Sequence, residues 1–133
     1  MRKIRVFAPA KLNLYLDVLG KRPDGFHNIE TIFEKIDLKD EILIKEKGKG
    51  LKVKTTPSNC SQGRENIVYK AAHALFEEAK VKLNLDIEIK KRIPVSAGLG
   101  GGSSDAASIL KAVNEIFKLG VPAKKLFSIA RDI

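Results

Sequence analysis

The chain has 133 residues, of which 44% are hydrophobic, 6% aromatic and 31% charged. This length suits one domain or one part of a larger fold, and the composition excludes a disordered protein. The single cysteine, Cys60, excludes an intramolecular disulfide and a cysteine-based metal cluster. No apolar run approaches the roughly 20 residues of a membrane span, and the N-terminus lacks the apolar segment of a signal peptide, so we expect a cytoplasmic protein without a membrane partner.

Lysine and arginine together number 25, against 16 aspartates and glutamates, which gives a net charge of +9. Such an excess suits ligands that carry phosphate, or nucleic acid. A basic α+β nucleic-acid-binding domain is therefore one alternative, and a steep salt dependence of RNA binding would support it. We expect no nucleic-acid partner, because acidic residues are interspersed with the basic ones and no strand face carries interleaved aromatic side chains.

Alternating apolar residues predict a run of strands in the first part of the chain. Ala8-Pro9-Ala10 separates the first two strands, turn residues at 20–25 precede the third, and residues 56–65 resemble a loop. The predicted strands, in chain order, lie at residues 4–6, 11–18, 29–36, 41–46 and 51–53.

After residue 65 the spacing of apolar residues becomes helical, with Asn66 as a good N-cap for the first helix. A strand follows at 83–89, a second helix begins at Ser103, and a third begins with Pro122 in its first turn. Strands followed by alternating helix and strand predict an α+β fold with a mixed sheet packed against helices. The last helix runs into Ile133 without a capping glycine, which suggests a cut chain.

Four of the ten glycines lie in the segment Gly98-Leu99-Gly100-Gly101-Gly102, between the last predicted strand and a helix. Glycine permits positive φ and a close approach of backbone N–H groups to a ligand, and a helix N-terminus favours anions. We therefore predict a phosphate-binding loop, with Ser103 or Ser104 offering a hydroxyl to Mg²⁺. The loop is neither a Walker A motif nor a dinucleotide fingerprint, because no lysine follows the glycines and Ser103 stands where a third glycine belongs. The alternative is a flexible turn.

Three segments resemble one family of enzymes, the GHMP kinases. The segments are Ala8-Pro9-Ala10-Lys11-Leu12-Asn13-Leu14, Pro94–Ser104 and Arg22-Pro23-Asp24-Gly25-Phe26-His27. The third resembles the signature of the 4-diphosphocytidyl-2-C-methyl-D-erythritol kinases within that family. The resemblance covers nearly the whole chain but only about half of the family's usual length, so residues 1–133 are expected to form the N-terminal, ATP-binding domain without its C-terminal partner.

The resemblance implies transfer of the γ-phosphoryl group of ATP, with Mg²⁺, to a hydroxyl of 4-diphosphocytidyl-2-C-methyl-D-erythritol, in non-mevalonate isoprenoid biosynthesis. It implies that Lys11 is catalytic, since a cation there lowers the pKa of the acceptor hydroxyl and stabilises the transferred phosphoryl group. From composition alone, Lys11 would be a solvated lysine at the edge of a sheet. The implied ATP-binding residues are Pro94, Val95, Ser96, Ala97, Gly98, Leu99, Gly100, Gly101, Gly102, Ser103 and Ser104.

Three further residues are implied to bind the acceptor substrate. Phe26 would stack on the cytosine, His27 would hydrogen-bond its edge, and Asn13 would hydrogen-bond the polyol or hold a neighbouring carboxylate. The alternatives are an aromatic anchor that closes a turn and a surface amide. Another GHMP kinase, acting on homoserine or a mevalonate derivative, would not need the Phe26-His27 pair, so a preference for a cytidine-containing acceptor separates the two possibilities.

In the family the catalytic base is an aspartate in a Gly-Ala-Asp-Val-Pro-like segment, which would follow Ile133; Asp132 does not fit that motif. We therefore expect these 133 residues alone to be nearly inactive, and to self-associate through a surface that the missing domain would cover. The basic run Lys90-Lys91-Arg92 has two interpretations at this stage: a solvated strand end, or a group of charges that attracts ATP.

Overall fold

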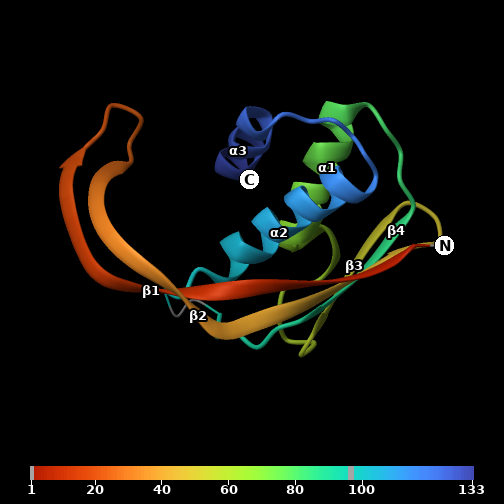
Figure 1. Ribbon diagram of the computed structural model, residues 1–133, viewed down its shortest axis with the longest axis horizontal. Coiled ribbons are helices and arrows are strands. Elements are labelled where there is room, and N and C mark those ends of the chain that lie inside the picture. Colours follow the sequence, from red (N-terminus) through yellow and green to blue (C-terminus); the bar gives the residue numbers. More distant parts are fainter. Residues whose placement is uncertain (1, 96–97) are drawn as a thin grey trace.

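The computed structural model describes residues 2–95 and 98–133, without the side chains at positions 12–18, 27 and 30–33. One sheet carries helices on one of its faces, and a long two-stranded arm extends beyond the helices (Figure 1). The strands are β1 (Lys3–Lys21), β2 (His27–Glu46), β3 (Leu51–Thr56) and β4 (Leu85–Lys90). The helices are α1 (Ile67–Ala79), α2 (Gly101–Ile116) and α3 (Ala123–Asp132), with a short 3-10 turn, η1 (Gly63–Glu65), before α1.

The sheet is mixed, as predicted, with the strand order β1-β2-β4-β3. β2 pairs antiparallel with β1 and with β4, whereas β3 and β4 run parallel because α1 connects them as a crossover helix. The α+β class is confirmed. None of the helices in the described part of the chain is long and apolar enough to cross a membrane.

Two predicted breaks were wrong: the one between strands 4–6 and 11–18, and the one between strands 29–36 and 41–46. β1 runs through Ala8-Pro9-Ala10 without ending, and β2 runs through residues 37–40. The pairing of β1 with β2 shifts register between Pro9 and Lys11, and such an irregularity accommodates a residue that has no N–H to donate to the ladder. The merged strands form the long β1–β2 arm of Figure 1.

The helix starts agree with the sequence to within two residues. Asn66 caps α1, since its Oδ1 accepts a hydrogen bond of 2.8 Å from the backbone N–H of Val68, and this prediction is confirmed. α3 begins one residue after Pro122. α2 begins at Gly101 and not at Ser103, so two of the loop glycines belong to the helix.

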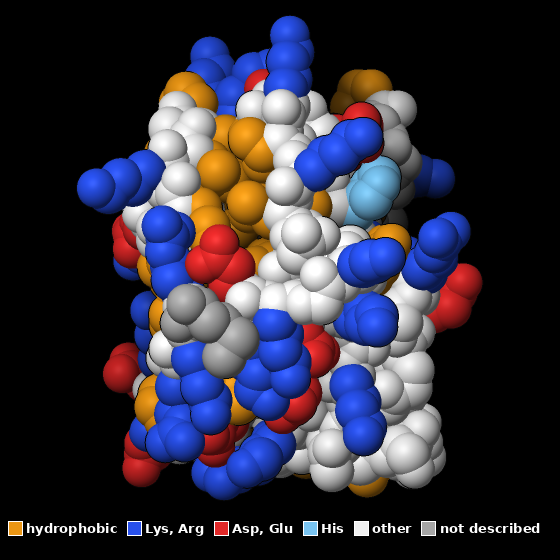
Figure 2. All heavy atoms as spheres, turned by 90° about the vertical axis from the view of Figure 1, so that its right-hand side faces the viewer, with side chains coloured by type: hydrophobic (Ala, Val, Ile, Leu, Met, Phe, Trp, Pro, Cys, Tyr) orange, Lys and Arg blue, Asp and Glu red, His pale blue; other side chains and the backbone are white. Residues whose placement is uncertain are grey.

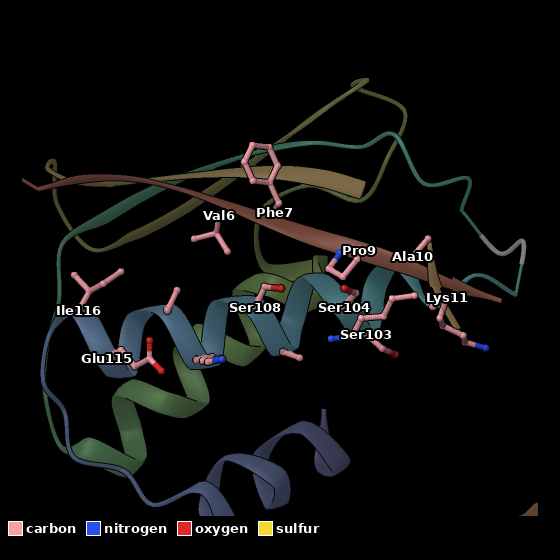
Figure 3. Close-up of a pocket in the computed structure, with 15 residues that line it drawn as sticks. Val6, Phe7, Pro9, Ala10, Lys11, Ser103, Ser104, Ser108, Glu115 and Ile116 are labelled. Atoms are coloured by element: carbon pink, nitrogen blue, oxygen red, sulfur yellow. The ribbon is translucent and has the colours of Figure 1, made fainter. Parts of the chain in front are cut away.

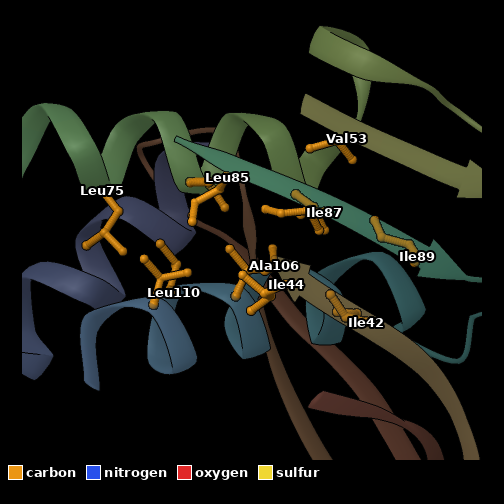
Figure 4. Packing of buried hydrophobic residues seen from close by; sticks show 14 of the residues in the cluster. Ile42, Ile44, Val53, Leu75, Leu85, Ile87, Ile89, Ala106 and Leu110 are labelled. Atoms are coloured by element: carbon orange, nitrogen blue, oxygen red, sulfur yellow. The ribbon is translucent and has the colours of Figure 1, made fainter. Parts of the chain in front are cut away.

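The core lies between the sheet and helices α1 and α2. Alternate residues of β2 and β4 point toward the helices, and Figure 4 shows them packed against Leu75 of α1 and Leu110 of α2. The hydrophobic residues of the two strands that are described as at most 1% exposed are Ile42, Ile44, Leu85, Ile87 and Ile89. Each such side chain contributes about 1.5–3 kcal/mol on burial. The glycine-rich segment therefore connects two elements, β4 and α2, that the core holds in place.

Candidate active site

The glycine-rich loop leaves the sheet after Lys90 and enters α2 at Gly101. Gly98 and Gly100 have φ values of 74° and 68°, in the left-handed region that favours glycine. Gly100 is the N-cap of α2 and has no side chain to satisfy the first N–H groups of the helix. These N–H groups, with the positive end of the helix dipole, are suited to bind an anion.

Lys11 of β1 contacts the middle of this loop. Its backbone N–H donates to the carbonyl oxygen of Leu99 at 2.9 Å, and its Nζ donates to the carbonyl oxygen of Gly98 at 3.2 Å. A Cβ on Gly100 would lie 3.1 Å from Cε and 3.2 Å from Cγ of Lys11. Two of the three motifs that suggested a kinase, separated by most of the chain, therefore meet in space.

A groove of about 880 Å³ runs between β1 and α2 beside this contact. Figure 3 shows Lys11, Ser103 and Ser104 at one end of the groove and Glu115 and Ile116 at the other. Lysines and serine hydroxyls dominate its polar lining, which suits a ligand that carries phosphate.

A second cavity, of about 610 Å³, lies on the other side of the loop. Its walls include residues 98–103, the capping residue Asn66 and the 59–61 loop. The side chain of Asn66 also donates to Thr55 Oγ1 at 3.1 Å and to the carbonyl oxygen of Ser61 at 2.8 Å, so it fixes this wall as well as capping α1. Gly100 and Ser103 line both spaces, and two ligands could therefore meet across the loop.

A buried group of charges lies under the loop, and the sequence analysis missed it. Lys91 Nζ donates to Asp40 Oδ2 at 2.6 Å and to Asp105 Oδ2 at 2.8 Å. The Asp40 side chain is fully buried and that of Asp105 is 3% exposed. Of the two interpretations of the basic run, the solvated strand end does not hold for Lys91, whose side chain is only 11% exposed.

The pKa values of the three groups diverge. Burial, and then a hydrogen bond with Asp40, raise the pKa of Asp105 to about 7 despite the nearby ammonium of Lys91. Burial also acts to raise the pKa of Asp40, but hydrogen bonds with Asp105, Ile93, Lys91 and Arg92 outweigh it and lower the pKa. Burial opposes the charge on Lys91, and the two carboxyl groups outweigh that effect and raise its pKa. Asp105 therefore titrates near neutral pH, whereas Asp40 is ionised there.

The predicted substrate residues lie on β1, on β2 and in the turn between them; Asn13 is two positions along β1 from Lys11. Phe26, at the tip of the arm, is 71% exposed; its N–H donates to Asp24 Oδ1 at 3.1 Å, and Gly25 has a φ of 91°. Asn13 and His27 belong to β1 and β2, but their side chains lie outside the described residues. Ser96 and Ala97 lie outside them too, whereas Pro94 and Val95 line the second cavity.

No group of three or more His, Cys, Asp or Glu side chains suited to a metal ion occurs among the described residues. This does not test the predicted Mg²⁺ ligands, because a Mg²⁺ ion that arrives with a nucleotide takes most of its ligands from phosphate and water. Ser103 and Ser104, at the start of α2, line the groove.

The sequence model of the family described as the GHMP kinases N-terminal domain matches residues 66–133, which include the loop and α2. The chain belongs to the GHMP kinase family. Its α+β fold, with a mixed sheet and a glycine-rich loop before a helix, is thus the N-terminal domain fold of this family, as predicted.

Curated relatives of this GHMP kinase domain are named 4-diphosphocytidyl-2-C-methyl-D-erythritol kinase. One from Acetivibrio thermocellus is 43% identical over 133 residues, and one from Geobacter sulfurreducens is 48% identical over 127 residues. The alignments cover 100% and 95% of this chain but only 47% and 46% of those proteins. The chain therefore spans about half the length of the curated relatives that it matches.

Solved structures of kinases have the same fold over nearly the whole of this chain. A crystal structure of 4-(cytidine 5'-diphospho)-2C-methyl-D-erythritol kinase is 38% identical, has a TM-score of 0.79, and is matched over 97% of this chain and 45% of that one. The mevalonate kinase of Methanococcus jannaschii is 18% identical, with a TM-score of 0.70 over 97% of this chain and 45% of that one. At that identity the likeness shows the shared fold alone.

Proposed function

We propose that this domain binds Mg-ATP on the loop 98–104 and forms the ATP-binding half of a 4-diphosphocytidyl-2-C-methyl-D-erythritol kinase. The reaction would transfer the γ-phosphoryl group to a hydroxyl of the methylerythritol unit, giving the 2-phosphate and ADP, in isoprenoid biosynthesis. The observation that carries the proposal is the contact of Lys11 with a glycine loop whose backbone favours anions. The names of the relatives support the choice of substrate.

In this proposal the loop and the start of α2 hold the phosphate groups through backbone N–H groups. Lys11, held against the loop carbonyls, places its ammonium at the boundary of the groove, where it stabilises charge on the transferred group and on the acceptor oxygen. Ser103 or Ser104 would hold Mg²⁺, which when bound neutralises the charge of the phosphate oxygens.

The acceptor would occupy the groove and the inner side of the β1–β2 arm. Asn13 would bind the polyol, while Phe26 and His27 would bind the cytosine at the far end of the arm. The proton of the acceptor hydroxyl must go to a base, and in the resemblance this base is an aspartate in a Gly-Ala-Asp-Val-Pro-like segment. Turnover is therefore a property of the whole protein, whereas nucleotide binding can be tested with this chain.

The deciding experiment is a titration of the ¹⁵N-labelled chain with Mg-ATP, followed through the backbone amides of residues 98–105. We expect chemical-shift changes concentrated in this segment, and weaker binding in Lys11→Met. Lys52→Met, at an exposed position on the edge strand β3, is the control that removes the same charge away from the loop. A folded sample without shifts at millimolar Mg-ATP would contradict the proposed function.

A further inference from the structure

The backbone pairing around the glycine loop has a gap that a side chain fills. β2 pairs with β4 as far as Glu41 and Lys90, the last residue of β4. The residue before Glu41 in β2 is Asp40, which still pairs with Ala8 of β1 but has no strand paired with it on the side of β4. On that side the chain leaves the sheet after Lys90 and continues into the glycine-rich loop.

The carboxylate of Asp40 takes the place of the missing strand. Its Oδ1 accepts hydrogen bonds from the backbone N–H of Arg92 at 2.7 Å and of Ile93 at 2.9 Å. Without these bonds both N–H groups would lose a partner at the edge of the core, at a cost of about 1–3 kcal/mol for each one that stays buried. Asp40 therefore determines where the loop departs from β4.

The position of Ile93 then determines the position of α2. Ile93 is 2% exposed, and a Cβ on Gly101, the first residue of α2, would lie 2.8 Å from its Cγ2 atom. The side chain of Ile93 thus packs directly against the backbone of α2 at Gly101, in space that a Cβ would need. Through Lys91, Asp40 is also linked to Asp105 in α2, so both ends of the loop are tied to one buried carboxylate.

We propose that Asp40 is a positioning residue for the phosphate-binding loop. It lines neither of the two cavities beside the loop. It acts through the backbone of Arg92 and Ile93 and through Lys91, which together hold the loop ready for phosphate before a ligand arrives. This inference rests on the proposed function, because the affinity that it explains is that for Mg-ATP.

The test compares Asp40→Asn with Asp86→Asn by calorimetric and ¹⁵N titration with Mg-ATP. Asp86, on β4, is also paired with a lysine, Lys47 at 3.8 Å, but this pair lies away from the loop. We expect Asp40→Asn to weaken binding by about tenfold or more, the scale usual for a residue that orients a binding group. Asp86→Asn should stay within about twofold of the parent, as surface substitutions do.

Folding and positioning are separated by measuring well below the unfolding temperature of each variant. In folded Asp40→Asn the amide resonances of 98–104 should shift and their hydrogen exchange should accelerate even without nucleotide. Unchanged affinity and unchanged loop amides in the folded variant would overturn the proposal. Should Asp40→Asn not fold, Asp40→Glu keeps the negative charge but moves the carboxylate away from the backbone N–H groups of Arg92 and Ile93. Parent-like affinity and parent-like loop amides in that variant would equally overturn the proposal.

The outcome for Asp40 is distinguishable from that for the proposed function. A parent chain that does not bind Mg-ATP would contradict the proposed function. The role of Asp40 would then be decided by the loop amides of the nucleotide-free chain: altered shifts and faster exchange in Asp40→Asn would support it, and unchanged ones would refute it.

Discussion

At the scale of single residues, we expect opposite effects on stability when the adjacent residues Gly101 and Gly102 are each replaced by alanine. Gly101→Ala would place a Cβ 2.8 Å from the buried side chain of Ile93, which cannot move aside, so we expect a loss of about 1–3 kcal/mol of stability. Gly102→Ala meets only Ile67 Cγ2, at 3.8 Å, and should be neutral or stabilising by up to about 1 kcal/mol through helix propensity. Thermal unfolding by circular dichroism measures both; equal shifts in Tm would contradict the packing argument.

A second residue-scale prediction follows from the pKa of Asp105, which is about 7 in the folded chain against an ordinary value of 3.8. Because the folded state binds this proton more tightly than the unfolded state, the resulting stability is present at low pH and is lost as the pH rises through 7. Asp105→Asn removes the titration. Between about pH 5 and about pH 8, urea midpoints of the parent should therefore fall more steeply than those of the variant. Parallel pH profiles would contradict this prediction.

At the scale of elements, periodicity predicted the three α-helices and the strand segments of the described residues, but it divided β1 and β2, missed η1 and misplaced element ends. The alternation of apolar residues predicted the sheet, yet Pro9 was read as a break because its effect depends on the register of β1 with β2, a property of the pair. The start of α2 likewise depends on Ile93, which lies outside the helix. Local sequence carries the period of an element, whereas its limits depend on tertiary contacts.

The candidate site, too, could be predicted from the sequence only in part. The glycine segment and Lys11 could be recognised because each is a local motif, and the structure brings them together. The group formed by Asp40, Lys91 and Asp105 could not be recognised, because its members come from β2, the loop after β4 and α2, and each is an ordinary charged residue in its own segment. Only the fold shows that the charges are buried.

At the scale of the whole molecule, the distribution of charge argues against a nucleic-acid-binding surface. Figure 2 shows lysine and arginine side chains spread over one face with acidic side chains among them, which does not resemble the continuous basic patch of a nucleic-acid-binding surface. The loop and the tip of the β1–β2 arm lie at different places on the molecule (Figure 1).

This separation predicts that a change at the arm tip affects one ligand and spares the other. Phe26→Ala should weaken binding of cytidine 5'-diphosphate by about 1–3 kcal/mol, the usual value of stacking between a base and an aromatic ring, and leave Mg-ATP unchanged. Leu19→Ala is the matched control, since Leu19 is also an exposed apolar residue of the arm, 58% exposed against 71% for Phe26. Isothermal titration calorimetry with each ligand gives the Kd values. Equal losses for both ligands would remove Phe26 from the acceptor site, and an effect of Leu19→Ala as large as that of Phe26→Ala would show that the arm contributes apolar surface in general and not an aromatic ring that recognises cytosine.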